Sequence, residues 1–290
     1  MNTETLDAPL LQQWVGKTQI AWDVIDAGTA EALAATLDHK WALKSGAVLP
    51  PLWHWIYFRS ACLQSEVGSD GHPRRGGFLP PVPLPRRMWA GGRLKFEAPL
   101  PLGVSATRTS CITDVTKKSS RSGDLVFVTV KHEIAHHDLI AITEEHDIVY
   151  REFPQPGAAA PTPKLAPESA KWSRTVTPDP VLLFRYSALT FNGHRIHYDR
   201  SYVTGVEGYP GLVVHGPLIA TLLVDLLLQS MPGAQLSEFS FRAVSPLFDT
   251  EPFELCAQPE ADGRTVSLWA KNVRGEIAMQ AEATLSASSN

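Results

Sequence analysis

The hydrophobic positions in the second half of the chain predict one buried helix among several strands. The run PLIATLLVDLLLQS (217–230) is apolar almost all the way round a helix, so this helix is expected to be buried. Pro217 suits the first turn, and the segment MPG at 231–233 ends the run. Strands are predicted before and after it, at VLLFRYSAL (181–189), LSEFSFRAV, PFELCAQPE, RTVSLWAKN and EIAMQAEATLS.

The first half repeats this order. A second Pro-started apolar helix is predicted over LPPLWHWIYFRSACLQS (49–65). Strand-like segments follow it: GRLKFEAPL, VSATRTSCITDV, DLVFVTVKHEIAHH and IAITEEHDIVY, with KKSSRSG as a turn. Each half is thus predicted to be a long helix followed by an antiparallel sheet. A sheet curled round a central helix is the hot-dog plan, so the predicted fold class is α+β, a double hot-dog.

The clearest boundary is REFPQPGAAAPTPKLAPESAK at 151–171, which is rich in Pro and Ala and poor in large apolar side chains. Such a segment favours extended chain and buries little surface. The predicted organisation is an N-terminal half at 1–150, a linker at 151–176 and a C-terminal half at 177–290.

Composition narrows the function classes. A net charge of −4 over 290 residues lacks the basic excess of a nucleic-acid binder. Three distant cysteines exclude a disulfide framework or a cysteine-rich metal site. The N-terminus lacks the pattern of a signal peptide, and the longest apolar run is too short for a bilayer. The prediction is a soluble cytoplasmic protein without a membrane partner.

The segment HEIAH at 132–136 matches the zinc-peptidase pattern H-E-x-x-H. That chemistry needs a helix, whereas LVFVTV before the motif predicts a strand. On a strand, residues four apart are separated by roughly 13 Å, too far for one zinc ion. The segment is therefore predicted to be a solvent-facing edge of a sheet.

A polar loop at 190–199, TFNGHRIHYD, is the stronger candidate site. Asn192 and His197 are five residues apart, so they converge only on a turn, which the Asn192-Gly193 dipeptide favours. The loop is expected to follow the end of the predicted strand at 181–189 and to present its side chains for chemistry.

A second feature, GYPGLVVHGPL at 208–218, opens the buried helix. The first N–H groups of a helix have no internal partner and carry the positive end of its dipole. Gly216 has no side chain to block a ligand, so its N–H can stabilise a carbonyl oxygen that gains negative charge.

The pairing of this polar loop with V-H-G-x-L resembles the MaoC-like, R-specific enoyl-CoA hydratases, whose motif is D-x-N-P-x-H followed by V-H-G-x-L. The matching stretch is Asn192-Gly193-His194-Arg195-Ile196-His197. Asn192 stands where the catalytic Asp is expected, and His194 stands where the Asn is expected. FRYSALTFNGHRIHYD and RRMWAGGRLKFEAPL resemble a narrower group, the mesaconyl-CoA and itaconyl-CoA hydratases and the mitochondrial hydroxyacyl-thioester dehydratase of type two.

The resemblance implies a hydro-lyase that hydrates a short branched dicarboxylic enoyl-CoA to a citramalyl-CoA type product. It implies catalytic roles for His197, as acid and base, and for Asn192, which can hold the water but cannot accept its proton. Gly216 corresponds to the oxyanion hole. Because the carboxylate is missing, His194 or Asp199 is a candidate helper. The predicted substrate-binding residues are His194, Arg195, His215, Arg87 and Trp89.

Several alternatives stay open. The first half lacks both motifs, so it is predicted to be a non-catalytic partner that shapes the acyl pocket. The activity could instead be a 3-hydroxyacyl-CoA or -ACP dehydratase for longer chains, or the chain could bind thioesters without turnover, as Asn192 suggests. A zinc site formed by His194, His197 and His215 is a further alternative, but the prediction is that no metal or cofactor is bound. A homodimer is expected on general frequency.

Overall fold

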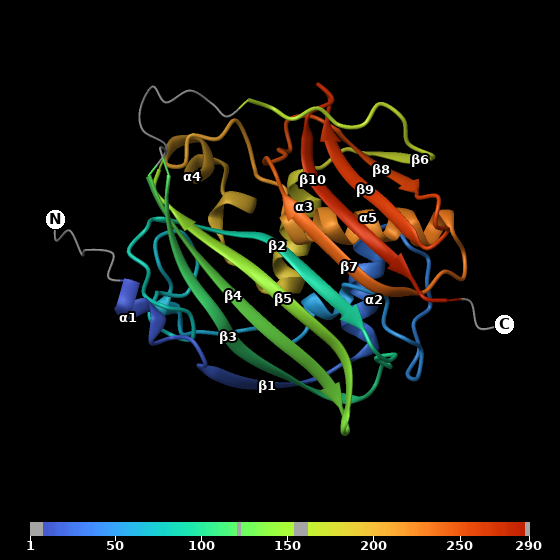
Figure 1. Cartoon of the computed structure of the whole chain (residues 1–290), viewed down its shortest axis with the longest axis horizontal. Helices are drawn as coiled ribbons and strands as arrows, with labels where there is room; N and C mark the ends of the chain where they lie inside the picture. The colour runs from blue at the N-terminus through green and yellow to red at the C-terminus, as the bar shows by residue number, and fades with distance from the viewer. Residues whose placement is uncertain (1–7, 121–122, 154–161, 288–290) are drawn as a thin grey trace.

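In the computed structural model, which describes residues 8–120, 123–153 and 162–287, one antiparallel sheet of ten strands runs through both halves. The strand order is β1-β3-β4-β5-β2-β7-β10-β9-β8-β6, so the two halves lie side by side (Figure 1). The N-terminal half contributes β1 (Thr18–Val24), β2 (Arg86–Phe96), β3 (Ser105–Ser120), β4 (Gly123–His136) and β5 (Leu139–Arg151). The C-terminal half contributes β6 (Trp172–Val176), β7 (Leu236–Ala243), β8 (Phe253–Pro259), β9 (Thr265–Asn272) and β10 (Ile277–Leu285).

The two halves join where β2 pairs with β7, from Gly91 opposite Arg242 to Lys95 opposite Glu238. A Cβ atom on Gly91 would lie 2.5 Å from the carbonyl oxygen of Phe241, so only glycine fits at this joint. The strands predicted at 236–286 and at 92–150 are confirmed, whereas β1 was not predicted.

The predicted helix of the C-terminal half is confirmed as α5 (Gly216–Ser230). Its residues from Leu218 to Leu227 are buried, and it packs against β6, β8, β9 and β10 (Figure 1). The one carboxylate in the apolar run, Asp225, is paired with Arg174 of β6 at 2.7 Å. A buried charge is tolerated there because it has this partner.

The helix predicted over 49–65 is wrong. Only one 3₁₀ turn, η1 (Trp53–Ile56), and a second at η2 (Gln64–Glu66) form there. Pro50 and Pro51 supply no N–H donors, and a residue followed by proline avoids the helical region. The apolar side chains of this segment are buried by tertiary packing rather than by a helix face.

A short helix that was not predicted, α2 (Ala27–Thr36), packs against η1 in the N-terminal half. Its start carries a recognisable signal, because the side chain of Asp26 accepts a hydrogen bond from the N–H of Thr29. α1 (Ala8–Gln12) packs against β3.

The strand predicted at 181–189 is also wrong, because this segment is the helix α3 (Pro180–Thr190). Asp179 caps it by accepting hydrogen bonds from the N–H groups of Val181 and Leu182, and Pro180 occupies the first turn. Phe191 ends it in the left-handed conformation. The cap and the proline outweighed the β-branched and aromatic composition.

The predicted linker is only partly described, since 154–161 lie outside the described residues. Its last five residues form β6, which pairs with β8 and so belongs to the C-terminal sheet. The domain boundaries themselves stay a prediction. Within the described ranges, no helix is long and apolar enough to cross a membrane.

Replacement of Leu223, which is fully buried in α5, by Ala is expected to lower the free energy of unfolding by about 2–5 kcal/mol. Urea denaturation measures this loss. The matched control is Val181→Ala, because that side chain lies on α3 and is 65% exposed, and a change within about 0.5 kcal/mol is expected. Equal losses in the two variants would contradict the assignment of α5 as the core helix.

Candidate active site

The polar loop lies between two helices rather than after a strand. After α3, the N–H of Asn192 donates to the carbonyl of Ser187, and its Oδ1 accepts from the N–H of His194 at 3.0 Å. The 3₁₀ turn η3 (Arg195–His197) follows, and Asp199 then caps α4 (Arg200–Gly205). The predicted turn is confirmed, and Asp199 has a structural role within it.

His197 is buried and held in one tautomer. Its Nδ1 donates to the carbonyl oxygen of Val213 at 2.7 Å, because a carbonyl can only accept. Burial lowers the pKa of His197 to about 4, so the ring is neutral at pH 7. Its Nε2 therefore carries a lone pair, and it makes no hydrogen bond to any residue that the structure describes. This is the state that a general base needs.

The ring of His215 packs against one face of the His197 ring. The two rings are stacked, with centroids 3.7 Å apart, and Nε2 of His215 lies 2.8 Å from Oγ of Ser187 on α3. Burial, and next the electrostatic interaction between the two rings, lower the pKa of His215 well below its usual value. His215 is thus a fully buried ring that braces His197.

Gly216 is the first residue of α5, and in the described part of the chain no acceptor is bonded to its N–H. A Cβ atom there would meet nothing closer than 3.9 Å, so the space beside it is open. The helix start thus offers an unpartnered N–H donor one residue after the ring that braces His197.

Two residues of the N-terminal half, Asp70 and His72, lie in the same cluster and were missed by the sequence analysis. The rings of His72 and His194 have centroids 4.1 Å apart, and His194 in turn lies edge-on to His197 at 5.5 Å. Oδ2 of Asp70 lies 3.1 Å from Nδ1 of His72. The dipeptide Asp70-Gly71 is a turn signal that could have marked this loop, but nothing in the sequence shows that it meets residue 194.

Electrostatics leave His72 and His194 neutral beside an ionised carboxylate. Burial lowers the pKa of His194 to about 2, assisted by its electrostatic interaction with the nearby ring of His72. Burial also lowers the pKa of His72, against the opposing effect of Asp70. Burial alone would raise the pKa of Asp70, but hydrogen bonds from His72 hold it well below its usual range.

The two loops are locked together by backbone contacts. The N–H of Arg195 donates to the carbonyl of Asp70 at 2.9 Å, and Nη1 of Arg195 donates to the carbonyl of Ser69 at 3.0 Å. Gly71 has φ +90°, and a Cβ atom on it would lie 1.8 Å from the carbonyl oxygen of Gly193. The two loops therefore meet backbone to backbone, because neither glycine has room for a side chain at this contact.

The remaining predicted binding residues differ in their surroundings. The guanidinium of Arg195 is paired with Asp199 at 2.8 Å and lies over the ring of Tyr202, so it braces the loop. Arg87 is half-buried, and its charge lowers the pKa of both His72 and His194.

Trp89 lies two residues further along β2, on the same face of the strand as Arg87. Its ring packs against Trp55, Phe241 and His146. Nε1 of Trp89 donates a hydrogen bond to the carbonyl of Gly91 at 2.8 Å.

The HEIAH segment is a strand, as predicted, which rules out the zinc-peptidase arrangement. Its predicted exposure is wrong at His132, which is buried and has its Nδ1 2.7 Å from Oγ of Ser110. The buried Glu144 of β5 pairs with His132 across the sheet. Its Oε2 lies 3.1 Å from Nε2 of His54, and its Oε1 lies 3.0 Å from Nε2 of His146. Residues of η1 and the strands form this buried polar cluster, in which Nδ1 of His54 has no hydrogen-bond partner among the described residues.

Two sets of side chains in the described ranges lie close enough to share an ion: Asp70, His72 and His194, and His132, Glu144 and His146. The zinc site that was weighed from His194, His197 and His215 is not among them. The stacking of His197 on His215 places their rings face to face rather than pointing at a common centre.

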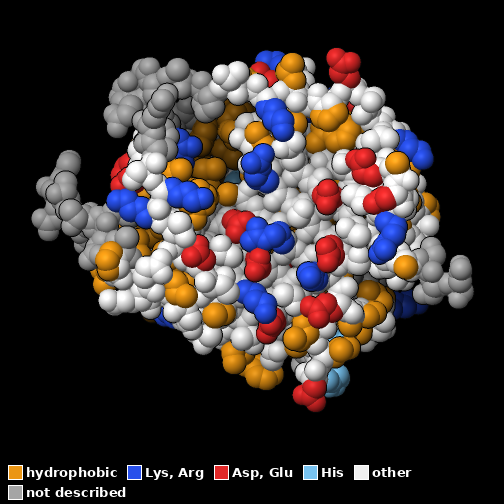
Figure 2. Space-filling model, viewed as in Figure 1, with side chains coloured by type: hydrophobic (Ala, Val, Ile, Leu, Met, Phe, Trp, Pro, Cys, Tyr) orange, Lys and Arg blue, Asp and Glu red, His pale blue; other side chains and the backbone are white. Residues whose placement is uncertain are grey.

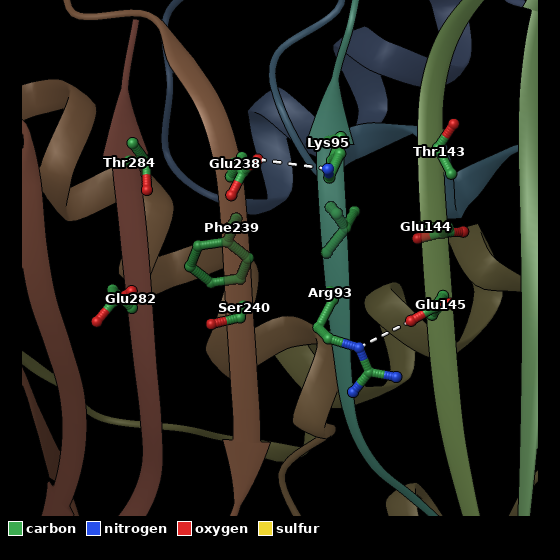
Figure 3. A pocket seen from close by; sticks show the side chains of 11 residues that line it. Arg93, Lys95, Thr143, Glu144, Glu145, Glu238, Phe239, Ser240, Glu282 and Thr284 are labelled. Carbon is green, nitrogen blue, oxygen red and sulfur yellow. Dashed lines mark hydrogen bonds and ion pairs between the residues drawn. The ribbon is translucent and has the colours of Figure 1, made fainter.

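A surface pocket on the outer face of the sheet has no histidine in its lining, although Glu144 of the second set reaches it. It follows the junction of β2 and β7 and is lined by Arg93, Lys95, Glu145 and Glu238 (Figure 3). These charges are already paired, at 2.8 Å for Arg93 with Glu145 and 3.7 Å for Lys95 with Glu238. The same face carries interspersed charges of both signs (Figure 2), as expected of a solvated surface.

The buried neutral histidines predict a loss of stability in acid. The folded pKa values of His197 (about 4) and His194 (about 2) lie below the ordinary 6.5, so the unfolded chain binds protons first as the pH falls. The stability is therefore full above pH 6.5 and falls below it, by up to about 1.4 kcal/mol per pH unit for each ring. Urea denaturation between pH 5 and 8 measures this slope. His194→Asn should make it shallower, and an unchanged slope would contradict a neutral buried His194.

Comparisons with known proteins agree with this geometry. The family of type 2 hydroxyacyl-thioester dehydratases matches residues 52–249. Mesaconyl-C(4)-CoA hydratase of Chloroflexus aurantiacus is 50% identical over 276 residues, which cover 94% of this chain and 96% of that protein.

Among solved structures, a MaoC-like dehydratase from Phytophthora capsici aligns with a TM-score of 0.70 at 14% identity, covering 97% of this chain and 99% of that one. A Mycobacterium tuberculosis protein described as a double hotdog fold aligns with a TM-score of 0.57 at 15% identity, covering 94% and 96%. These confirm the predicted α+β double hot-dog. The chain belongs to the type 2 hydroxyacyl-thioester dehydratase family, and it is a hydro-lyase.

Proposed function

We propose that this enzyme adds water across the double bond of a short branched dicarboxylic enoyl-CoA, with mesaconyl-C4-CoA as the first substrate to test and a citramalyl-CoA type product. The relative that is 50% identical over nearly the whole chain bears the name of that activity. Itaconyl-CoA, an isomeric C5 dicarboxylic ester, is the next candidate.

The observation that carries the proposal is the arrangement at the start of α5. A neutral imidazole with a bare Nε2 stands beside an unpartnered backbone N–H in an otherwise buried setting. Addition of water to an enoyl thioester needs a base for the water and a donor for the oxygen that becomes an enolate. His197 and Gly216 supply these two groups.

The reaction balances on these groups alone. Nε2 of His197 takes one proton from the water as its oxygen bonds to the β-carbon, and the π electrons of the double bond move to the thioester enolate. The Gly216 N–H donates to the enolate oxygen. The imidazolium of His197 then returns its proton to the α-carbon, so that the ring ends neutral. Asn192 has its Oδ1 engaged by the N–H of His194, which supports a role in shaping the loop and leaves its amide NH₂ as the group that can touch the water.

The surroundings of Arg87 favour a substrate with a second, free carboxylate. Its positive charge acts on His72 and His194, and in the part of the chain that the structure describes it forms no ion pair with a carboxylate. Its neighbour Arg86, by contrast, is paired with Glu207 at 3.2 Å. A half-buried guanidinium that interacts with the hydroxyl of Tyr150 but with no described carboxylate is suited to bind the free carboxylate of the acyl group. Trp89, on the same strand face, would form an apolar wall beside it.

The family description supports a second candidate, dehydration of a longer 3-hydroxyacyl thioester on CoA or ACP. The same residues would catalyse it, because dehydration is the reverse step. Binding without turnover is the third candidate. The absence of a resident cofactor or metal, the cytoplasmic location and the homodimer stay predictions.

The first experiment follows the loss of enoyl absorbance of mesaconyl-C4-CoA, itaconyl-CoA and crotonyl-CoA with purified protein. We expect fast hydration of a C5 dicarboxylic ester, and a loss of at least about 100-fold in kcat for His197→Ala. Near-normal turnover by His197→Ala would overturn the role of His197. Binding of all three esters without turnover would favour the non-catalytic candidate.

Replacement of Arg87 by Met should remove the selectivity for a dicarboxylic substrate. A charge-assisted hydrogen bond contributes about 1.5–3 kcal/mol, so kcat/KM for mesaconyl-C4-CoA should fall about 10- to 100-fold while that for crotonyl-CoA changes little. Arg93→Met, on the outer face, is the matched control. Equal losses on both esters would show that Arg87 does not bind the second carboxylate.

A further inference from the structure

The catalytic loop lacks the carboxylate that its family motif places at position 192, yet a carboxylate is present in the cluster. Asp70 arrives from the N-terminal half on the loop that is locked to Gly193. It does not face His197 directly. Its Oδ2 contacts His72, whose ring packs on His194, which lies edge-on to His197.

We propose that Asp70 and His72 take the place of the missing loop carboxylate: His72 is a second catalytic residue that accepts a hydrogen bond from the reacting water, and Asp70 is the positioning residue behind it. The inference rests on the proposed function. It makes the N-terminal half part of the catalytic site, rather than only a wall of the acyl pocket.

The geometry of the pair defines the state of His72. An ionised Asp70 can only accept, so the proton between them lies on Nδ1 of His72. The N–H of His72 donates to Oδ1 of the same carboxylate at 3.0 Å, which fixes Asp70 against its own loop. A neutral ring with hydrogen on Nδ1 has a bare Nε2, and Nε2 of His72 bonds to no residue in the described ranges. A carboxylate behind an imidazole is the arrangement that holds a catalytic ring in one tautomer.

The site then holds two neutral rings with bare Nε2 atoms, one from each half, and both rings pack against His194. A water has two hydrogens to donate. One is transferred to His197 during the reaction, and the other stays in the product hydroxyl. An acceptor for this second hydrogen fixes the orientation of the water, and His72 can fill that role without gaining or losing a proton.

The interlocked glycines are an independent reason to assign this loop to the site. At this contact a Cβ atom on Gly71 is excluded, and a Cβ atom on Gly193 would lie 2.6 Å from the carbonyl oxygen of Gly71. A loop that served only to cover the surface would not need so close a backbone contact. Both contacts sit immediately beside Asp70, His72 and His194. They fix the relative position of the two imidazoles, which is what a water held between two rings requires.

The test uses His72→Asn on the full chain with the ester that the wild type hydrates. Asparagine places an N–H near the position of Nδ1, so it can still donate to Asp70, but it has no acceptor at the position of Nε2. We expect kcat to fall about 100-fold with little change in KM. Asp70→Asn should lower kcat about 10-fold or more, and the double variant should be no worse than His72→Asn, because Asp70 acts through His72.

The decisive variant restores the family carboxylate. Asn192→Asp in the His72→Asn background should recover at least about 10-fold of the lost kcat, whereas a structural role for His72 predicts no recovery. The matched control is His137→Asn, since His137 is exposed and has φ +51°, a conformation that asparagine adopts readily. Its activity should equal that of the wild type.

Normal kcat in both His72→Asn and Asp70→Asn, with wild-type hydration intact, would overturn the inference and leave the proposed function standing. Multiplicative losses in the double variant, or no recovery with Asn192→Asp, would do the same. Wild-type activity abolished by EDTA and restored by a divalent cation would also overturn it, because Asp70, His72 and His194 would then hold an ion. If His72→Asn does not fold, the same comparison is made in the Asp70→Asn background. Recovery of the lost kcat by the added Asn192→Asp supports the inference, and no recovery overturns it.

Discussion

The contact between the backbones of Gly71 and Gly193 fixes the geometry of the site. One glycine comes from a loop of the N-terminal half and the other from the loop that carries His194 and His197, and neither position has room for a side chain. Because Arg195 also donates to the carbonyls of Ser69 and Asp70, the two loops form one unit. The site is thus shared between halves that are joined by pairing of β2 with β7.

Burial decides the protonation of this site. His194, His197 and His215 all have lowered pKa values, and in each case burial is the largest cause. A hydrogen bond to a fixed acceptor, the carbonyl of Val213, then sets which nitrogen of His197 is bare. Neutral rings are bases rather than cations, so the positive charge that acts on His72 comes from Arg87 and Arg75, and the start of α5 adds the positive end of its dipole.

The two halves use the same sheet plan for different purposes. The C-terminal half has a long buried helix, α5, whose first residue is Gly216. In the N-terminal half, the longest helix of the described residues is the ten-residue α2, and the inner sheet face carries the buried cluster of His54, His132, Glu144 and His146. The carboxylate of Glu144 is kept ionised there by the two histidines that flank it, against a burial effect that would raise its pKa. The N-terminal half therefore contributes the loop of Asp70 and His72 to the site cluster, whereas the C-terminal half contributes the start of α5.

The sequence by itself determined the family plan. The alternation of apolar and polar residues marked eight of the ten strands, and the apolar run with Pro217 marked α5, because these patterns reflect local burial that each segment carries alone. The loop motif and the glycine of V-H-G-x-L likewise marked His197 and Gly216. The sequence missed α3, where an Asp-Pro cap outweighed strand-like residues, and wrongly predicted a helix at 49–65, where prolines break it. Only the tertiary structure decided that Asp70 and His72 meet His194, more than 120 residues away along the chain. That contact depends on the docking of two loops, which leaves no periodic signal in either of them.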